Sequence, residues 1–215
     1  MTKNIFAITV LLLSALAHAQ PAPAGTTPEV IERVYKAGGG ENWSKVKRLK
    51  FTFNVEEGGT LKLSARHDWD VSAGTDTVTW GDKTVTVRLA DAASAADKDQ
   101  AAAFQRWTND SYWLLMPLKL KDGGVRFGPV TSGGPDRANV TMSFAGVGLT
   151  PGDQYDLSID TRTDRVVHWV YRPGADKKLA FAWDAYQTFG PLTLATDHKS
   201  DDGARRIYFT DVSAE

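Results

Sequence analysis

The sequence predicts an α+β protein that is mainly antiparallel β, and three observations support this fold class. Apolar and polar residues alternate with a period of two through most of the chain, as in strands with one covered and one solvent-facing side. A helical pattern precedes the first alternating segment, and an Ala-rich stretch interrupts the alternation near the middle. We expect about eleven strands in one long meander. Because strands twist, such a sheet curls, and the inserted helices are placed to cover its concave apolar face as a lid.

Composition and charge exclude several classes of protein. The chain has 215 residues, with 25 Lys and Arg against 26 Asp and Glu, and a formal net charge of −1. Nucleic-acid-binding proteins usually carry a clustered positive excess, so no nucleic-acid partner is expected. The absence of cysteine excludes disulfides, thiolate metal sites and a cysteine nucleophile. A hydrophobic share of 42% and a charged share of 24% are those of a folded protein.

Residues 1–19 have the pattern of a secretory signal peptide. Lys3 supplies the positive start, residues 5–17 are almost wholly apolar, and Ala17-His18-Ala19 fits the small-residue cleavage pattern. The apolar run is shorter than the ~20 residues of a membrane span, so we expect cleavage after Ala19 rather than an uncleaved anchor. Residues 20–25 then form a flexible Pro/Ala leader, residues 26–215 form a single domain, and no transmembrane segment remains. For a bacterial chain this predicts a periplasmic location.

The first half of the domain is predicted as a helix followed by strands. Residues 26–37 form the helix, because Thr26 and Glu29 match a capping box and Gly38-Gly39-Gly40 ends the pattern. Alternation then marks strands at 49–55, 61–71, 78–80 and 85–89.

A helical insertion separates these strands from the second half. We expect one helix over residues 93–107 and a second over 110–116, which Pro117 ends. The remaining strands are predicted at 125–131, 138–145, 155–160, 165–172, 178–186, 192–198 and 205–212.

Four stretches of the chain carry a resemblance to a known family. They are residues 37–43 with 46–53, residues 80–83, residues 109–117 with 119–122, and residues 147–155 with 159–169. Together they resemble the periplasmic lipoprotein-carrier superfamily with the LolA/LolB-like fold, and within it the outer-membrane-lipoprotein-sorting-like proteins. The resemblance implies an unclosed, curved β-barrel whose helices cap an apolar cavity. It also implies a transport function in which that cavity holds lipoprotein acyl chains.

Large apolar side chains on the covered faces are the candidate ligand-binding residues. Each buried CH₂ group contributes ~0.8 kcal/mol, so a sixteen-carbon chain gains on the order of 10 kcal/mol before ordering costs. The candidates are Phe53, Leu63, Trp69, Trp80, Phe104, Trp107, Trp113, Met116, Met142, Trp169, Phe181 and Trp183. The same side chains would equally fill a core, so the alternative is a periplasmic interaction or scaffold domain without a small ligand.

No constellation for catalysis, a cofactor or a metal ion is recognisable in the sequence. No histidine pair has the spacing of a zinc site, and neither a Gly-x-Ser-x-Gly nor a P-loop pattern occurs. His67 lies on an apolar strand face and is expected to be hydrogen-bonded in the core or at its rim. A third alternative is a hydrolase that uses His67 with Asp68 or Asp70, but on a regular strand these side chains point to opposite faces. We therefore expect a non-enzymatic protein that binds a lipid or acylated ligand, with a membrane-associated protein as a candidate partner.

Overall fold

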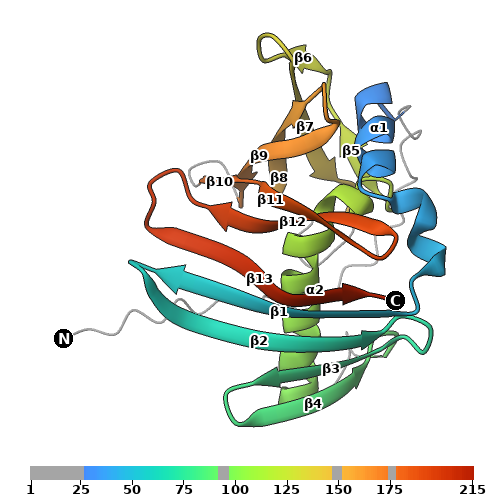
Figure 1. Cartoon of the computed structure of the whole chain (residues 1–215), viewed down its shortest axis with the longest axis vertical. Coiled ribbons are helices and arrows are strands. Elements are labelled where there is room, and N and C mark those ends of the chain that lie inside the picture. The colour runs from blue at the N-terminus through green and yellow to red at the C-terminus, as the bar shows by residue number, and fades with distance from the viewer. Residues whose placement is uncertain (1–26, 92–96, 147–151, 174–177) are drawn as a thin grey trace.

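The computed structural model describes residues 27–91, 97–146, 152–173 and 178–215 as two antiparallel β-sheets and a long helix that runs across them (Figure 1). The predicted signal peptide, its cleavage site and the leader at 20–25 lie outside the described residues, and so does Thr26 of the predicted capping box. The predicted fold class, mainly antiparallel β with a few helices, is confirmed.

The larger sheet has seven strands in the order β11-β12-β13-β1-β2-β3-β4. Their bounds are β1 Arg48–Glu57, β2 Thr60–Asp70, β3 Thr75–Trp80, β4 Lys83–Arg88, β11 Asp184–Phe189, β12 Leu192–Lys199 and β13 Arg205–Ala214. The alternation of the sequence buries Phe51 of β1 and Trp69 of β2 on the same side. The register places His67 between Phe51 and Val78, so His67 lies in the middle of the covered face.

The smaller sheet has six strands, in the order β10-β9-β8-β7-β5 with β6 paired to β7. Their bounds are β5 Val125–Phe127, β6 Thr131–Ser132, β7 Arg137–Phe144, β8 Gln154–Asp160, β9 Arg165–Arg172 and β10 Leu179–Ala182. Met142, Leu157 and Trp169 from three neighbouring strands are buried. These three side chains belong to the same core cluster as the covered face of the larger sheet.

The strand count and the sheet architecture differ from the prediction. The described residues form thirteen strands in two sheets, instead of about eleven in one unclosed barrel. The segment predicted as one strand at 178–186 is split, because β10 pairs with β9 whereas β11 pairs with β12. Ala185 has a φ of 52°, a left-handed conformation that interrupts the extended chain just after Trp183. An isolated bridge between Phe181 and Ser200 links the two sheets beside this crossing.

The helices are α1 Glu29–Ala37, the short 3₁₀ helix η1 Gly40–Lys45 and α2 Lys98–Lys119. Helix α1 begins three residues later than predicted and buries the expected apolar positions Val30, Ile31 and Val34. None of the helices in the four described ranges combines the length and the apolar character that crossing a bilayer requires.

Helix α2 replaces the two helices predicted at 93–107 and 110–116, so the predicted break is wrong. Its start is stabilised by Asp97, whose carboxylate accepts hydrogen bonds from the backbone N–H groups of Asp99 and Gln100. Pro117 lies in the last turn rather than after it. The proline lacks an N–H group, so the helix loses only the hydrogen bond to the carbonyl of Trp113 and still reaches its last turn.

Gly190, in the turn between β11 and β12, occupies a position that only glycine fits. Its φ is 53°, and a Cβ atom there would collide with the carbonyl oxygen of Ala214 in β13. Gly59 has a φ of 74° but nothing within 4 Å of such a Cβ atom, so it is a matched control. We expect Gly59→Ala to lower the free energy of unfolding by about 1–2 kcal/mol, and Gly190→Ala by clearly more, at least about 2–3 kcal/mol. Equal losses in chemical denaturation would contradict the close approach of this turn to β13.

Candidate functional site

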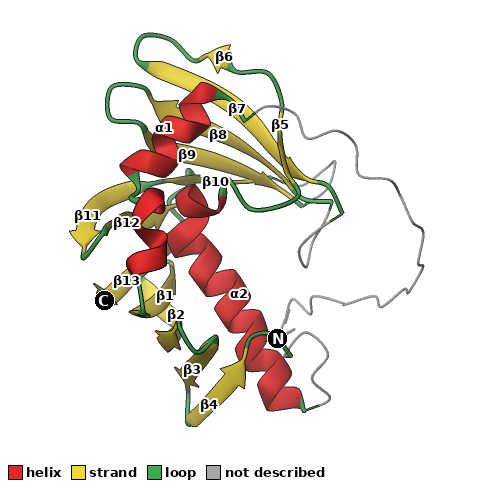
Figure 2. Ribbon diagram, turned by 90° about the vertical axis from the view of Figure 1, so that its right-hand side faces the viewer, coloured by secondary structure: helices red, strands yellow, loops and turns green. Residues whose placement is uncertain are grey.

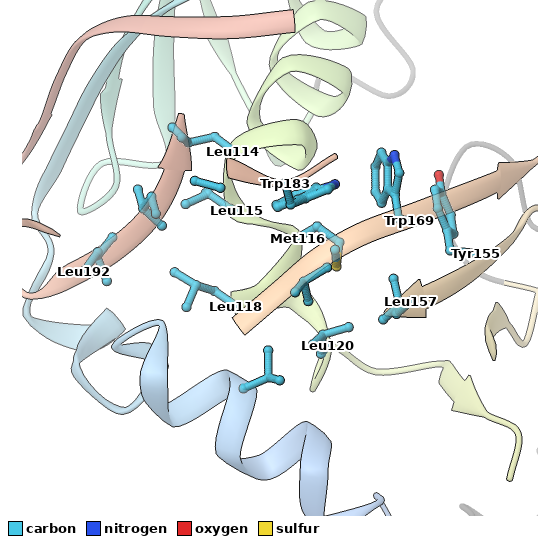
Figure 3. Close-up of a cluster of buried hydrophobic side chains, with 14 of the residues drawn as sticks. Leu114, Leu115, Met116, Leu118, Leu120, Tyr155, Leu157, Trp169, Trp183 and Leu192 are labelled. Carbon is cyan, nitrogen blue, oxygen red and sulfur yellow. The ribbon is translucent and has the colours of Figure 1, made fainter. Parts of the chain in front are cut away.

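Helix α2 is the element that covers the apolar faces of both sheets. Figure 2 shows it running from β4 at one end to the smaller sheet at the other. Near its C-terminal end the consecutive residues Leu114, Leu115 and Met116 are all buried. Successive helical side chains point about 100° apart, so burial of three in a row means that this end of α2 is surrounded. Figure 3 shows the three side chains in one cluster with Trp169 and Trp183.

Six of the twelve predicted ligand-binding residues meet at this end of α2. They are Trp113, Met116, Met142, Trp169, Phe181 and Trp183. The ring centroid of Trp113 lies 4.6 Å from that of Trp169 and 4.9 Å from that of Phe181. Trp169 in turn lies 5.1 Å from Trp183, centroid to centroid. Helix α2 and the smaller sheet therefore share one continuous aromatic contact.

The other six candidates lie under the larger sheet and beside the first half of α2. They are Phe53, Leu63, Trp69, Trp80, Phe104 and Trp107. Trp107 of α2 packs 5.2 Å from Trp69 and 5.7 Å from Phe104 between ring centroids. Trp80 lies at the margin, half-buried, with the Arg106 guanidinium 5.1 Å from its ring centroid. The candidates thus form two groups along one helix rather than one compact patch.

The interior between α2 and the sheets is packed by the protein's own rings. The two best-formed hollows of the described chain, of about 170 and 300 Å³, both have mostly polar or charged linings. None of the twelve candidates lines either hollow. The larger one lies on the outer side of the seven-stranded sheet, among Lys50, Arg66, Asp68 and Asp211. A ligand in the aromatic interior would have to displace part of this packing.

Several indole N–H groups in this interior lack a hydrogen-bond acceptor. The Nε1 atoms of Trp69, Trp107, Trp169 and Trp183 are buried, and none has an acceptor within the described ranges. A buried donor without a partner costs about 1–3 kcal/mol. The interior is therefore lined mainly by apolar atoms, but it also holds indole N–H groups to which an oxygen atom of a bound molecule could accept hydrogen bonds.

His198 in β12 is a further interior residue, which the sequence analysis did not assign to the site. It is fully buried, with its ring centroid 4.3 Å from that of Trp183 and 5.6 Å from that of Trp113. The carbonyls of Ala182 and Trp113 lie near its ring, although neither ring nitrogen has the geometry of a hydrogen bond. Burial lowers the pKa of His198 to about 3, so this ring is neutral near pH 7.

His67 is a hydrogen-bonded core histidine, as expected, but both of its partners were missed. Its Nδ1 lies 2.7 Å from Oδ2 of Asp76 in β3, and its Nε2 lies 3.1 Å from Oδ2 of Asp110 in α2. The sequence carried a signal for Asp76, which precedes Val78 by two residues and so shares its covered face. Asp110 follows Trp107 by three residues on one helix face, which is the same kind of signal.

The arrangement required for the hydrolase alternative is not present around His67. Asp68 lies on the other side of the sheet, where it accepts hydrogen bonds from Arg48. Asp70 accepts a hydrogen bond from the backbone N–H of Ala73. Within the described ranges, no group of three His, Asp or Glu side chains is arranged to hold a metal ion.

Comparison with known proteins gives likenesses in structure but not in sequence. No protein-family model matches the sequence, and no curated protein matches it. The chain is similar to a DUF1329 family protein from Desulfovibrio piger, with 8% identity, a TM-score of 0.45, and coverage of 87% of this chain and 94% of that one. It is similar to a LolA superfamily protein from Nitrosomonas europaea, with 7% identity, a TM-score of 0.45, and coverage of 86% and 93%.

Proposed function

We propose that this chain is a secreted, periplasmic, non-enzymatic protein that binds a lipid or acyl chain between α2 and the two sheets. The observation that carries the proposal is the position of α2, one helix that covers apolar side chains of both sheets along its length. A shift of this helix would expose two groups of aromatic and methionine side chains along its length. Such a surface suits a flexible hydrocarbon chain.

Uptake of an acyl chain would offset part of the free energy that opening costs. Displacement of the end of α2 exposes Leu114, Leu115 and Met116, at about 1.5–3 kcal/mol each or roughly 5–9 kcal/mol together, in addition to other buried residues of the helix such as Leu118. A sixteen-carbon acyl chain in their place gains on the order of 10 kcal/mol before ordering costs. The unpartnered indole N–H groups add to the balance, because oxygen atoms of a lipid would accept their hydrogen bonds.

A second candidate function is an interaction or scaffold domain with a filled core and no small ligand. The close ring packing around Trp169 favours it, as does the position of the two hollows outside the aromatic interior. In this case α2 would be a permanent part of the core. Saturable uptake of a fluorescent lipid separates the two functions, since a filled core offers no site for it.

We expect Trp113→Glu to weaken the binding of a fluorescent fatty acid by at least about tenfold. Trp113 is half-buried on α2 and contacts the rings of Trp169 and Phe181, so a carboxylate there would meet the acyl chain. The matched control is Tyr208→Glu, which replaces another half-buried aromatic residue, one that contacts Arg206 rather than the interior aromatic clusters. Titration by fluorescence gives both dissociation constants, and circular dichroism checks that strand content is kept. Equal affinity in the two variants would contradict the placement of the site.

A further inference from the structure

A buried polar cluster joins α2 to the seven-stranded sheet. His67 comes from β2, Asp76 from β3 and Asp110 from α2, and their relative exposures are 0%, 0% and 2%. The other polar links between α2 and this sheet are Lys83 to Asp99 and Gln100 to the carbonyl of Thr86, and both are exposed. The cluster is therefore the buried polar attachment of the helix to the sheet within the described residues.

The geometry of two contacts favours a protonated His67. Each ring nitrogen faces a carboxylate oxygen, at 2.7 Å for Asp76 and 3.1 Å for Asp110. A neutral imidazole has one N–H donor, whereas an imidazolium has two, and an ionised carboxylate only accepts. Both contacts are hydrogen bonds at once when the three groups together hold one proton more than a neutral imidazole between two ionised carboxylates, as in an imidazolium between two carboxylates. Phe51 stacks on the ring at 4.5 Å between centroids and excludes water from that side.

The charges around His67 favour its cationic form. Burial by itself lowers the pKa of His67, but the hydrogen bonds that its ring donates to Asp110 and Asp76 more than offset this, and the pKa is raised. On the outer side of the sheet, the hollow that His67 borders is also lined by Lys50, Arg66, Asp68 and Asp211, two charges of each sign. These four charges sum to zero, and the two charged groups that contact the ring itself are Asp76 and Asp110.

We propose that His67, Asp76 and Asp110 form a charged latch that positions α2 on the sheet and loosens as the pH rises. A histidine with a raised pKa stabilises the closed arrangement fully below its free pKa of about 6.5, and this contribution is lost as the pH rises through its folded pKa. Deprotonation removes one of the two N–H donors and leaves a buried carboxylate without its charged partner. The part of the inference that concerns ligand exchange rests on the proposed function, whereas the latch itself does not.

His198 determines the pH range in which the latch can be tested. It is neutral in the closed protein and contacts Trp113 of α2, so opening of the helix would expose it to water. Below its free pKa of about 6.5 it would then gain a proton, which favours opening and opposes the effect of His67. Above that pH it stays neutral in both states, and His67 acts alone among these two histidines.

Amide hydrogen exchange of the full chain between about pH 6.5 and about pH 9 tests the latch, with rates corrected for intrinsic exchange. The α2 amides of the native protein should lose protection relative to those of β1 as the pH rises, by a factor on the order of ten. This change should vanish in His67→Gln. It should also vanish in Asp110→Asn, which keeps the shape of the side chain and covers the case in which His67→Gln fails to fold. Asp68→Asn changes a residue on the outer side of β2, the strand of His67, and this variant should still lose α2 protection as the pH rises.

Constant protection of α2 in the native protein over this range would overturn the latch. A loss of α2 protection with rising pH that is as large in Asp110→Asn as in the native protein would also overturn it. A fluorescent fatty acid added to the same samples separates the two claims. Faster uptake at high pH in the native protein, but not in Asp110→Asn, links the latch to ligand exchange. A pH-dependent α2 without lipid uptake at any pH would refute the proposed function and leave the latch supported.

Discussion

Replacement of Trp169 by alanine is expected to lower the free energy of unfolding by about 3–5 kcal/mol. Trp169 is 1% exposed and contacts the rings of Trp113, Tyr155 and Trp183, so its removal leaves a cavity where both sheets and α2 meet. The surrounding side chains come from α2, from β8 and from the link between β10 and β11, and collapse of the cavity would require movement of all three. Urea denaturation followed by far-ultraviolet circular dichroism measures the loss.

Trp80→Ala is the matched control for this variant. Trp80 is half-buried and packs beneath Arg106 at the margin of the larger sheet. Its removal should cost only about 1 kcal/mol, because water can fill the space and the cation–π contact is solvent-exposed. A loss as large as that of Trp169→Ala would mean that the centre of packing lies near β3 rather than between the sheets.

Asp76→Ala is expected to cost about 3–5 kcal/mol near pH 6, because it breaks the shorter of two buried ion pairs and leaves the Nδ1–H group of the His67 imidazolium buried without an acceptor. The cost should decrease as the pH rises. The pKa of His67 is raised, so the stabilisation that its charge gives is complete below about pH 6.5 and disappears above its folded pKa. Denaturation curves at several pH values between about pH 6 and about pH 9 test both the size and the sign.

Asp68→Ala controls for the loss of a carboxylate in the same region of the sheet. Asp68 pairs with Arg48 on the exposed side, and such pairs contribute about 0–1 kcal/mol. A small loss for Asp68→Ala beside a large one for Asp76→Ala is the expected contrast. Similar losses in the two variants would contradict the assignment of a buried ionic cluster around His67.

The local alternation of apolar and polar residues predicted the positions of the strands well, but it predicted less well which strands pair with each other. Period-two alternation located β1 and β9 within a few residues, because each has one covered and one wet face. The same rule failed at 178–186, where the chain leaves one sheet and enters the other at Trp183. Both halves of this segment are extended and partly apolar, so only the pairing with β9 or β12 separates them. Strand pairing is a long-range property that a local pattern does not contain.

The burial of most of the large apolar candidate residues was predicted, whereas the polar partners of His67 were missed. Large side chains on covered faces indicated Trp169 and Trp183, and both lie in the interior. Asp76 and Asp110 were overlooked because a lone carboxylate is usually solvated, and its burial depends on a partner that is distant in sequence. His67 and Asp110 are 43 positions apart and meet only after α2 has packed on the sheet. The prediction that Pro117 ends the helix was wrong for a related reason, since burial of its neighbours keeps the last turn of α2 helical.

The central claim is that the surface beneath α2 receives a lipid or acyl chain, and the native mass of the protein tests it most directly. The full chain would be produced in a bacterial host, purified from the periplasm without detergent and weighed intact. We predict extra mass that dissociates as phospholipid or fatty acid, or that appears when lipid is added. The bare polypeptide mass, unchanged after addition of lipid, would contradict the claim and favour the filled scaffold domain.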